Sequence, residues 1–179
     1  MKTYIALLRG VNVAGRNKLG MPELVKSCEA LGFAEVRSYL QSGNLIFVAQ
    51  GTAADVADAL EARIAQDFGH AVQMLVLPAE ELDHVLAANP LRGEEEKHGH
   101  ATFLFRHVSE TRFAELALPL VDGEKAKLIG RVVILYCPHG YAKTKLNTRY
   151  FEKQLGVPAT TRNLRTVRAL RDMSAPRQS

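Results

Sequence analysis

A β-hairpin is predicted by the segment Val36-Arg-Ser-Tyr-Leu-Gln-Ser-Gly-Asn-Leu-Ile-Phe-Val-Ala49, in which two short strands flank the polar turn Gln41-Ser-Gly-Asn44. Before the hairpin, residues 3–8 have the composition of a buried strand, and residues 21–31 form an amphipathic helix that Pro22 starts. After it come a helix over 53–68 and a strand over 72–77. Because the hairpin interrupts a parallel βαβ pattern, the order β-α-β-β-α-β indicates a ferredoxin-like unit with an antiparallel sheet.

The same order of elements begins again after residue 100. A strand over 102–108, a helix over 110–118, a hairpin over 125–137 and a helix over 146–155 are predicted. No strong strand follows, and a last helix is expected over 162–173. The sequence therefore predicts an α+β fold with two duplicated ferredoxin-like units, the second incomplete or closed by a helix. The expected divisions are residues 1–78 for unit one, 79–100 for a helix and a mobile connector, and 101–179 for unit two with a basic C-terminal helix.

Length and composition are typical of a soluble globular protein. The apolar run before Arg9 has only five residues, which is too short for a signal peptide, and no later run of the 179 residues approaches a membrane span. Cys28 and Cys137 are the only cysteines and have no CxxC spacing, so we interpret them as reduced core thiols. These features predict a cytoplasmic protein that does not enter a membrane.

Positive charge is concentrated in the last quarter of the chain. Residues 140–179 have a net charge of +7, whereas residues 1–139 sum to −3. Four of the basic residues, Arg162, Arg165, Arg168 and Arg171, recur every third position in the last predicted helix. They are compatible with a stripe that contacts nucleic-acid phosphates or with a solvated helix face, and both interpretations stay open.

The first candidate site is the loop Arg9-Gly-Val-Asn-Val-Ala-Gly-Arg-Asn-Lys18, called the Arg9–Lys18 loop below. Glycine allows close approach to a ligand, basic side chains supply charge-assisted donors, and a helix N-terminus attracts anions. We expect Arg9 and Lys18 to contact phosphate or carboxylate, with Asn12 and Asn17 as supporting donors. The alternative is that the asparagines and glycines satisfy turn geometry while the basic residues pair with local acids. The loop matches neither a P-loop nor a Rossmann fingerprint.

The second candidate site is the Gln41–Asn44 turn. In a ferredoxin-like sheet with strand order 4-1-3-2, the first two strands point the same way, so this turn lies at the same sheet edge as the Arg9–Lys18 loop. Gln41, Ser42 and Asn44 are expected to orient a ligand there or simply to form a favourable turn. A nucleophilic Ser42 would need a general base, for which His70 is the nearest candidate.

A third cluster contains Lys143, Arg162 and Asn163. Thr161 is expected to cap the last helix, whose N-terminus beside Lys143 and Arg162 suits an anion. By contrast, no metal site is predicted at His98 and His100, because no further ligand is evident beside the neighbouring glutamates.

Several short sequence motifs along the chain are specific for one protein family when they occur together. They are Arg9-Gly-Val-Asn-Val-Ala-Gly15 with Asn17-Lys18 and Met21, Gly32-Phe33, Val36–Asn44, and Thr160-Thr-Arg-Asn163 with Thr166-Val167. Together they resemble the bacterial domain-of-unknown-function family 1697 over nearly the whole chain. The resemblance implies a duplicated ferredoxin-like architecture and a cytosolic protein, with no established activity. The chain departs from the family pattern at Ala14, where Gly is frequent, and at Leu164-Arg165, where Trp-Asn is common and would offer a stacking aromatic.

Binding of a phosphorylated or otherwise anionic ligand, either a nucleotide or a nucleic-acid segment, is the leading functional hypothesis. The Arg9–Lys18 loop and the Gln41–Asn44 turn would hold it, completed by Lys143 and Arg162. No cofactor is predicted. The rival hypotheses are an enzyme acting on a phosphorylated small molecule, for which no acid–base pair is obvious, and a protein-interaction module. The aromatic residues of the predicted strands lack the RNP signature of RNA-binding sheets, which weakens the hypothesis that the ligand is RNA.

Overall fold

The computed structural model describes residues 1–176 and divides into two compact units. The first contains residues 1–82 together with the segment that begins at Leu170, and the second contains residues 83–169. Each unit has one four-stranded antiparallel sheet. Within the described residues, no helix combines the length and the apolar character needed to cross a membrane.

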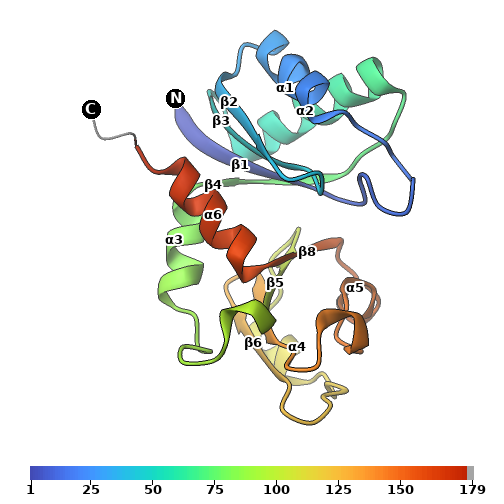
Figure 1. Ribbon diagram of the computed structural model, residues 1–179, viewed down its shortest axis with the longest axis vertical. Helices are drawn as coiled ribbons and strands as arrows, with labels where there is room; N and C mark the ends of the chain where they lie inside the picture. The colour runs from blue at the N-terminus through green and yellow to red at the C-terminus, as the bar shows by residue number, and fades with distance from the viewer. Residues whose placement is uncertain (177–179) are drawn as a thin grey trace. The chain divides into compact units, whose positions relative to one another are not determined.

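The first unit has the predicted β-α-β-β-α-β order (Figure 1). Its elements are β1 (Lys2–Leu8), α1 (Met21–Ala30), β2 (Ala34–Tyr39), β3 (Asn44–Ala49), α2 (Ala53–Phe68) and β4 (Met74–Pro78). The strands lie in the order β2-β3-β1-β4, and β3 is antiparallel to both β1 and β2. β1 and β2 therefore run in the same direction, which confirms the topology that the sequence predicts.

Local sequence signals explain why these elements start and stop where they do. Thr52 and Asp55 form a reciprocal capping box at the start of α2, and Gly69 ends the helix in a left-handed conformation with φ 70°. Both α1 and α2 pack on one face of the sheet, where Tyr4 and Phe47 are fully buried among helix side chains. This core holds the sheet edge described below in place.

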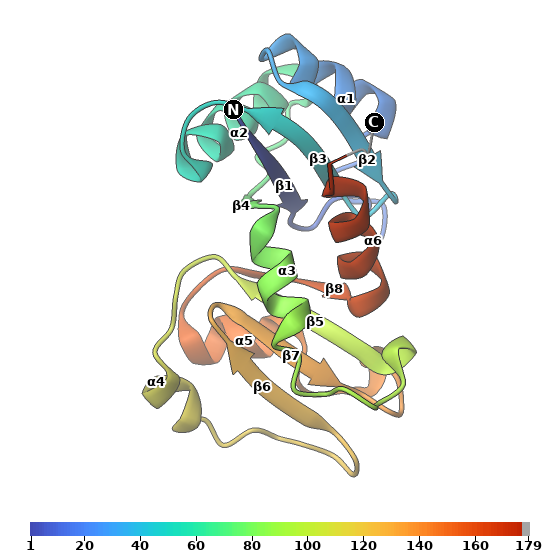
Figure 2. The ribbon, with the colours of Figure 1, turned by 90° about the vertical axis from the view of Figure 1, so that its left-hand side faces the viewer.

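The second unit repeats the same topology with shorter helices (Figure 2). Its elements are η1 (Glu96–His98), β5 (Gly99–Leu104), α4 (Glu110–Ala114), β6 (Lys125–Ile129), β7 (Val132–Tyr136), η2 (Tyr141–Lys143), α5 (Thr148–Leu155) and β8 (Ala159–Asn163). Two further helices, α3 (Glu80–Ala87) and α6 (Leu164–Ser174), contribute residues to both units. The strand order is β6-β7-β5-β8, so the fold is the duplicated ferredoxin-like architecture that the sequence predicts.

One element of the prediction is wrong, because a strand does follow residue 155. Residues 159–163 form β8, which pairs antiparallel with β5 and completes the second unit. The sequence Thr160-Thr-Arg-Asn163 has no apolar alternation, so its strand character comes from pairing rather than from hydrophobic patterning. Helix α6 accordingly begins at Leu164, and Asn163 Oδ1 accepts the Thr166 N–H at 2.8 Å. Asn163 thus takes the capping role predicted for Thr161.

Two side chains of the segment predicted to be a mobile connector form ion pairs with other parts of the second unit. Glu94 forms an ion pair with Lys125, and Arg168 Nε lies 2.9 Å from Glu96 Oε1. His98 is the last residue of η1, and its ring contacts the Tyr136 ring edge-on. His100 lies within β5, so the two imidazoles do not belong to the same strand. Within residues 1–176, no three His, Cys, Asp or Glu side chains gather in a metal-binding arrangement.

Candidate functional site

The Arg9–Lys18 loop and the Gln41–Asn44 turn lie side by side at one edge of the first sheet. Leu8 N–H donates to the Gly43 carbonyl at 2.9 Å, and Asn12 Nδ2 donates to the Gln41 carbonyl at 2.7 Å. Two polar, glycine-containing segments that are about thirty residues apart in sequence are therefore joined by direct hydrogen bonds, as the strand order predicts.

Asn12 is the residue that holds this junction together. Its Oδ1 accepts the Leu19 N–H at 2.9 Å, and its Nδ2 donates to the carbonyls of Leu19 at 3.1 Å and Gln41 at 2.7 Å. Its backbone is left-handed, with φ 53°, a conformation that asparagine tolerates better than most residues. Because both side-chain groups are engaged with the protein, Asn12 positions the loop.

The loop has a defined and unusual backbone. Five of its residues are left-handed, with φ between 46° and 76°: Gly10, Asn12, Ala14, Gly15 and Asn17. Ala14 and Gly15 occupy the centre of a tight turn closed by the Arg16 N–H donating to the Val13 carbonyl at 2.9 Å, and two successive positive φ values are typical of a type I′ turn. Asn17 Nδ2 donates to the Gly10 carbonyl at 3.2 Å, which closes the base of the loop.

The turn divides into buried and exposed parts. Asn44 is fully buried, and its Nδ2 donates to the Tyr39 carbonyl at 2.8 Å and to Ser42 Oγ at 3.0 Å. Gly43 has φ 83°, and a Cβ at this position would lie 2.4 Å from Val11 Cγ2, so no side chain fits there. Gln41 and Ser42 are exposed. Only these two residues of the turn present side chains that a ligand can reach.

A shallow, open pocket of about 450 Å³ lies where the loop and the turn meet. Its lining residues are Asn12, Gly15, Lys18, Leu19, Gly20 and Gln41. Lys18 and the nearby Arg16 are exposed, and within residues 1–176 neither side chain has an ion-pair or hydrogen-bond partner. The pocket therefore has one lysine on its wall, and Arg16 follows the lining residue Gly15 in the chain.

The N-terminus of α1 contributes less to this pocket than the sequence suggests. A Cβ at Gly20, the N-cap residue, would lie 2.0 Å from Glu23 Oε2, so the Glu23 carboxylate lies against the start of its own helix. An acidic residue in the first turn already interacts favourably with the helix dipole. Any anion in the pocket must therefore be held by basic side chains, because the helix end faces a negative charge.

The residues predicted to complete the site belong to the second unit. Arg162 is only 8% exposed, and its Nη1 donates to Thr160 Oγ1 at 2.7 Å and to the Thr161 carbonyl at 3.1 Å. This burial lowers the pKa of Arg162 to about 10. Asn163 caps α6, and Lys143 is exposed at the end of η2. The Arg162 guanidinium is thus engaged inside its own unit.

The arginines predicted to form a basic stripe do not form a continuous row. Arg162 is buried in β8, Arg168 is paired with Glu96, and Arg171 Nε lies 3.0 Å from Asp172 Oδ1. Arg177, which contributes to the basic composition of this region, lies outside the described residues. The arrangement weighs against a phosphate-binding track along α6.

Sequence analysis missed a network of hydroxyl groups in the second unit. Thr102 Oγ1 and Thr161 Oγ1 lie 2.8 Å apart, and Thr161 Oγ1 lies 2.7 Å from Thr148 Oγ1. The Thr148 N–H donates to Tyr141 Oη at 3.1 Å, and the Tyr141 ring stacks on His100 at 4.7 Å. Burial lowers the pKa of His100. Only the pairing of β8 with β5 brings these residues together, so no local sequence pattern reveals the network.

Comparison with known proteins gives the chain a family. The model of a family described as "Protein of unknown function (DUF1697)" matches residues 1–134. The chain belongs to the DUF1697 family. Among solved structures, it is similar to the conserved bacterial protein SP0830 from Streptococcus pneumoniae, with 25% sequence identity, a TM-score of 0.75, and coverage of 97% of this chain and 98% of that chain. No curated protein matches the DUF1697 chain.

Proposed function

We propose that this DUF1697 protein binds a small phosphorylated or otherwise anionic ligand in the pocket between the Arg9–Lys18 loop and the Gln41–Asn44 turn. The observation that carries the proposal is the exposed Lys18 on the pocket wall, which, like Arg16 two positions earlier, has no ion-pair or hydrogen-bond partner within residues 1–176. Both side chains are available to an external anion. Gln41 adds an exposed amide at the same place.

The loop is suited to binding because it is already ordered. Asn12 joins it to the turn through the Gln41 carbonyl, and Asn17 closes its base. A ligand therefore does not have to order the loop, which would otherwise reduce its affinity. A charge-assisted hydrogen bond contributes roughly 1.5–3 kcal/mol, so two such contacts contribute about 3–6 kcal/mol. This free energy corresponds to dissociation constants of about 0.04–6 mM.

A small ligand is favoured over a long nucleic acid. The pocket is confined to one loop and one turn, and of the four arginines at every third position Arg162 is buried in β8 while Arg168 and Arg171 form ion pairs. Nucleic-acid binding would require many phosphate contacts distributed along a track. A phosphorylated small molecule needs only the few contacts that this pocket offers. An enzyme acting on such a molecule would use the same pocket, and turnover of the bound probe would reveal it.

The test is an NMR titration of the ¹⁵N-labelled protein with inorganic phosphate, adenosine monophosphate and an oligothymidylate. We expect saturable shifts of the Gly15, Lys18 and Gln41 amides with one of the small phosphates. Lys18→Gln should weaken this binding roughly tenfold. The matched control is Lys26→Gln, which removes the same charge from an exposed position on α1 and should leave affinity unchanged.

Three results would contradict the proposal. The first is the absence of localised shifts with any probe. The second is an equal loss of affinity in the Lys18 and Lys26 variants, which would indicate general attraction to a basic protein. The third is binding of the oligothymidylate alone with a steep salt dependence, which would favour nucleic acid instead.

A further inference from the structure

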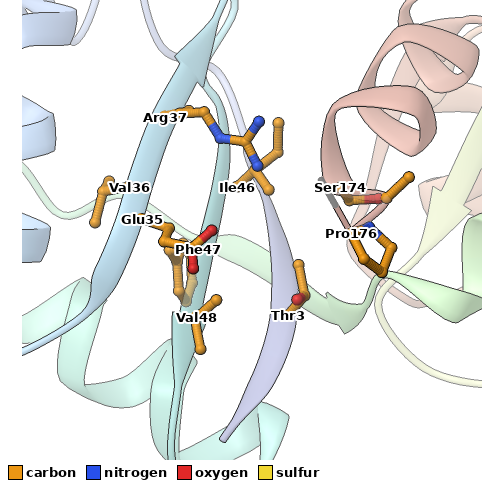
Figure 3. Close-up of a pocket in the computed structure, with 10 residues that line it drawn as sticks. Thr3, Glu35, Val36, Arg37, Ile46, Phe47, Val48, Ser174 and Pro176 are labelled. Carbon is orange, nitrogen blue, oxygen red and sulfur yellow. The ribbon is translucent and has the colours of Figure 1, made fainter. Parts of the chain in front are cut away.

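A second pocket lies on the face of the first sheet opposite α1 and α2, towards the β2 edge (Figure 3). It has a volume of about 670 Å³, and its lining includes Thr3, Glu35, Arg37, Ile46, Val48 and Pro176. The register pairs Arg37 with Ile46 and Thr3 with Val48, so these four side chains share one face of the sheet. All of the lining residues belong to the first unit. The volume is in the range of small-molecule sites.

Arg37 is the functional group that distinguishes this pocket. In Figure 3 its side chain extends from β2 across Ile46 into the space bounded on the far side by Ser174 and Pro176. Its Nε is buried, and no group among residues 1–176 accepts a hydrogen bond from it. Buried guanidinium nitrogens in folded proteins almost always have an acceptor. This donor is therefore available to an acceptor that a ligand supplies.

The backbone of β2 is distorted where it meets the pocket. The register with β3 shifts between Ala34 and Arg37, and Glu35 is left-handed with φ 52°. Such bulges redirect side chains and are frequent beside binding sites on edge strands. Here the distortion accompanies two opposite charges in one pocket, and within the described residues Glu35 and Arg37 do not form an ion pair. The Arg37 guanidinium is therefore not neutralised by Glu35.

We propose that this pocket binds a small monocarboxylic acid with an apolar body. A planar guanidinium matches a carboxylate in a bidentate arrangement, and one arginine balances one negative charge. A phosphate dianion fits less well, because Arg37 is the only basic residue in the described lining and Glu35 would repel the second charge. Val48 and Pro176 supply apolar surface for the rest of the molecule.

The test uses sodium benzoate as the probe and the neutral isostere benzamide as its control. The Nε–Hε resonance of Arg37 is observed in ¹H–¹⁵N spectra of the full chain. Benzoate should shift this resonance and the amides of Ile46 and Val48 in a saturable way, and benzamide should bind roughly tenfold more weakly or not at all. Arg37→Gln should abolish the shifts at Ile46 and Val48. Arg37→Lys keeps the positive charge but removes the planar guanidinium that can bind a carboxylate in a bidentate arrangement, so it should weaken benzoate binding.

A matched variant separates this site from the phosphate site proposed above. Arg16→Gln removes an arginine of the same unit outside this pocket and should leave benzoate binding unchanged. Well-dispersed spectra of every variant will show that each has folded. Equal binding of benzoate and benzamide, or shifts that persist in Arg37→Gln, would overturn the proposal. So would benzoate shifts confined to Lys18 and Gly15, because the carboxylate would then occupy the other pocket.

Discussion

Replacement of Asn12 by alanine tests the claim that one side chain holds the candidate site together. The substitution removes hydrogen bonds to the Leu19 N–H, the Leu19 carbonyl and the Gln41 carbonyl. At roughly 0.5–1.5 kcal/mol each, with a reduction for partial solvent exposure, these bonds contribute about 2 kcal/mol. Alanine at φ 53° adds about 1 kcal/mol of backbone strain. We therefore expect the free energy of unfolding to fall by about 3 kcal/mol.

Asn17→Ala is the matched control. Asn17 lies in the same loop and is also left-handed, with φ 46°, but its side chain makes one exposed hydrogen bond, to the Gly10 carbonyl. The strain is therefore similar and the loss of hydrogen bonding smaller, so we expect a decrease of about 1.5 kcal/mol. The difference between the two variants measures the bonds that are specific to Asn12.

Urea denaturation followed by far-ultraviolet circular dichroism measures both variants, since the chain has no tryptophan to report unfolding. Asn12→Asp provides a further check. Its carboxylate would face two carbonyl oxygens, which raises the pKa of that carboxyl in the folded protein. Its stability deficit should therefore be full at neutral pH, should shrink as the pH falls through the raised pKa of the folded protein, and should be smallest once the pH reaches about 4, where the carboxyl of the unfolded chain is protonated as well. If Asn12→Ala is no less stable than Asn17→Ala, the junction is held by something other than this side chain.

Three further predictions follow from other parts of the structure. Gly43→Ala should lower the free energy of unfolding by about 3 kcal/mol, because it combines a positive φ with a steric clash. Gly10→Ala, at φ 67° with open space around it, should lower this free energy by only about 1 kcal/mol. Equal losses in the two variants would refute the clash. Hydrogen bonds from Ser27 and Arg63 lower the pKa of Asp67. The melting temperature of the wild type should therefore exceed that of Asp67→Asn by its full margin near neutral pH, and this difference should disappear as the pH falls below about 4. A difference that stays constant with pH would contradict this prediction. Burial raises the pKa of the Cys28 thiol to about 12 and that of the Cys137 thiol to about 11. Neither thiol should therefore react with a thiol reagent at pH 8 until urea unfolds the chain.

Much of the fold follows from local patterns. Helix α2 spans residues 53–68 as predicted, because Thr52 and Asp55 cap its start and Gly69 ends it. The hairpin around residues 41–44 and the order of elements were sufficient to predict the strand order, and hence the contact between the Arg9–Lys18 loop and the turn. Such features are accessible because helix ends and tight turns depend on neighbouring residues.

Strand β8 and the Arg37 pocket were not accessible in this way. Thr160-Thr-Arg-Asn163 has no hydrophobic alternation and becomes a strand only by pairing with β5. Arg37 lies in a segment predicted as an ordinary strand, and its significance depends on a register shift and on Pro176, far away in the sequence. Both features depend on contacts between distant segments, to which propensity and periodicity are insensitive.

The sequence by itself determined the order of strands and helices up to β8, the position of the turn, and the sheet edge at which loop and turn meet. These depend on short-range chemistry: apolar spacing, caps and glycines. Only the tertiary structure decided the role of each polar side chain. Asn12 and Asn44 are engaged in internal hydrogen bonds, Arg162 is buried, and Lys18 stays exposed. The same residue type can serve as scaffold or as ligand contact, and the difference depends on whether a partner from a distant segment satisfies its hydrogen bonds.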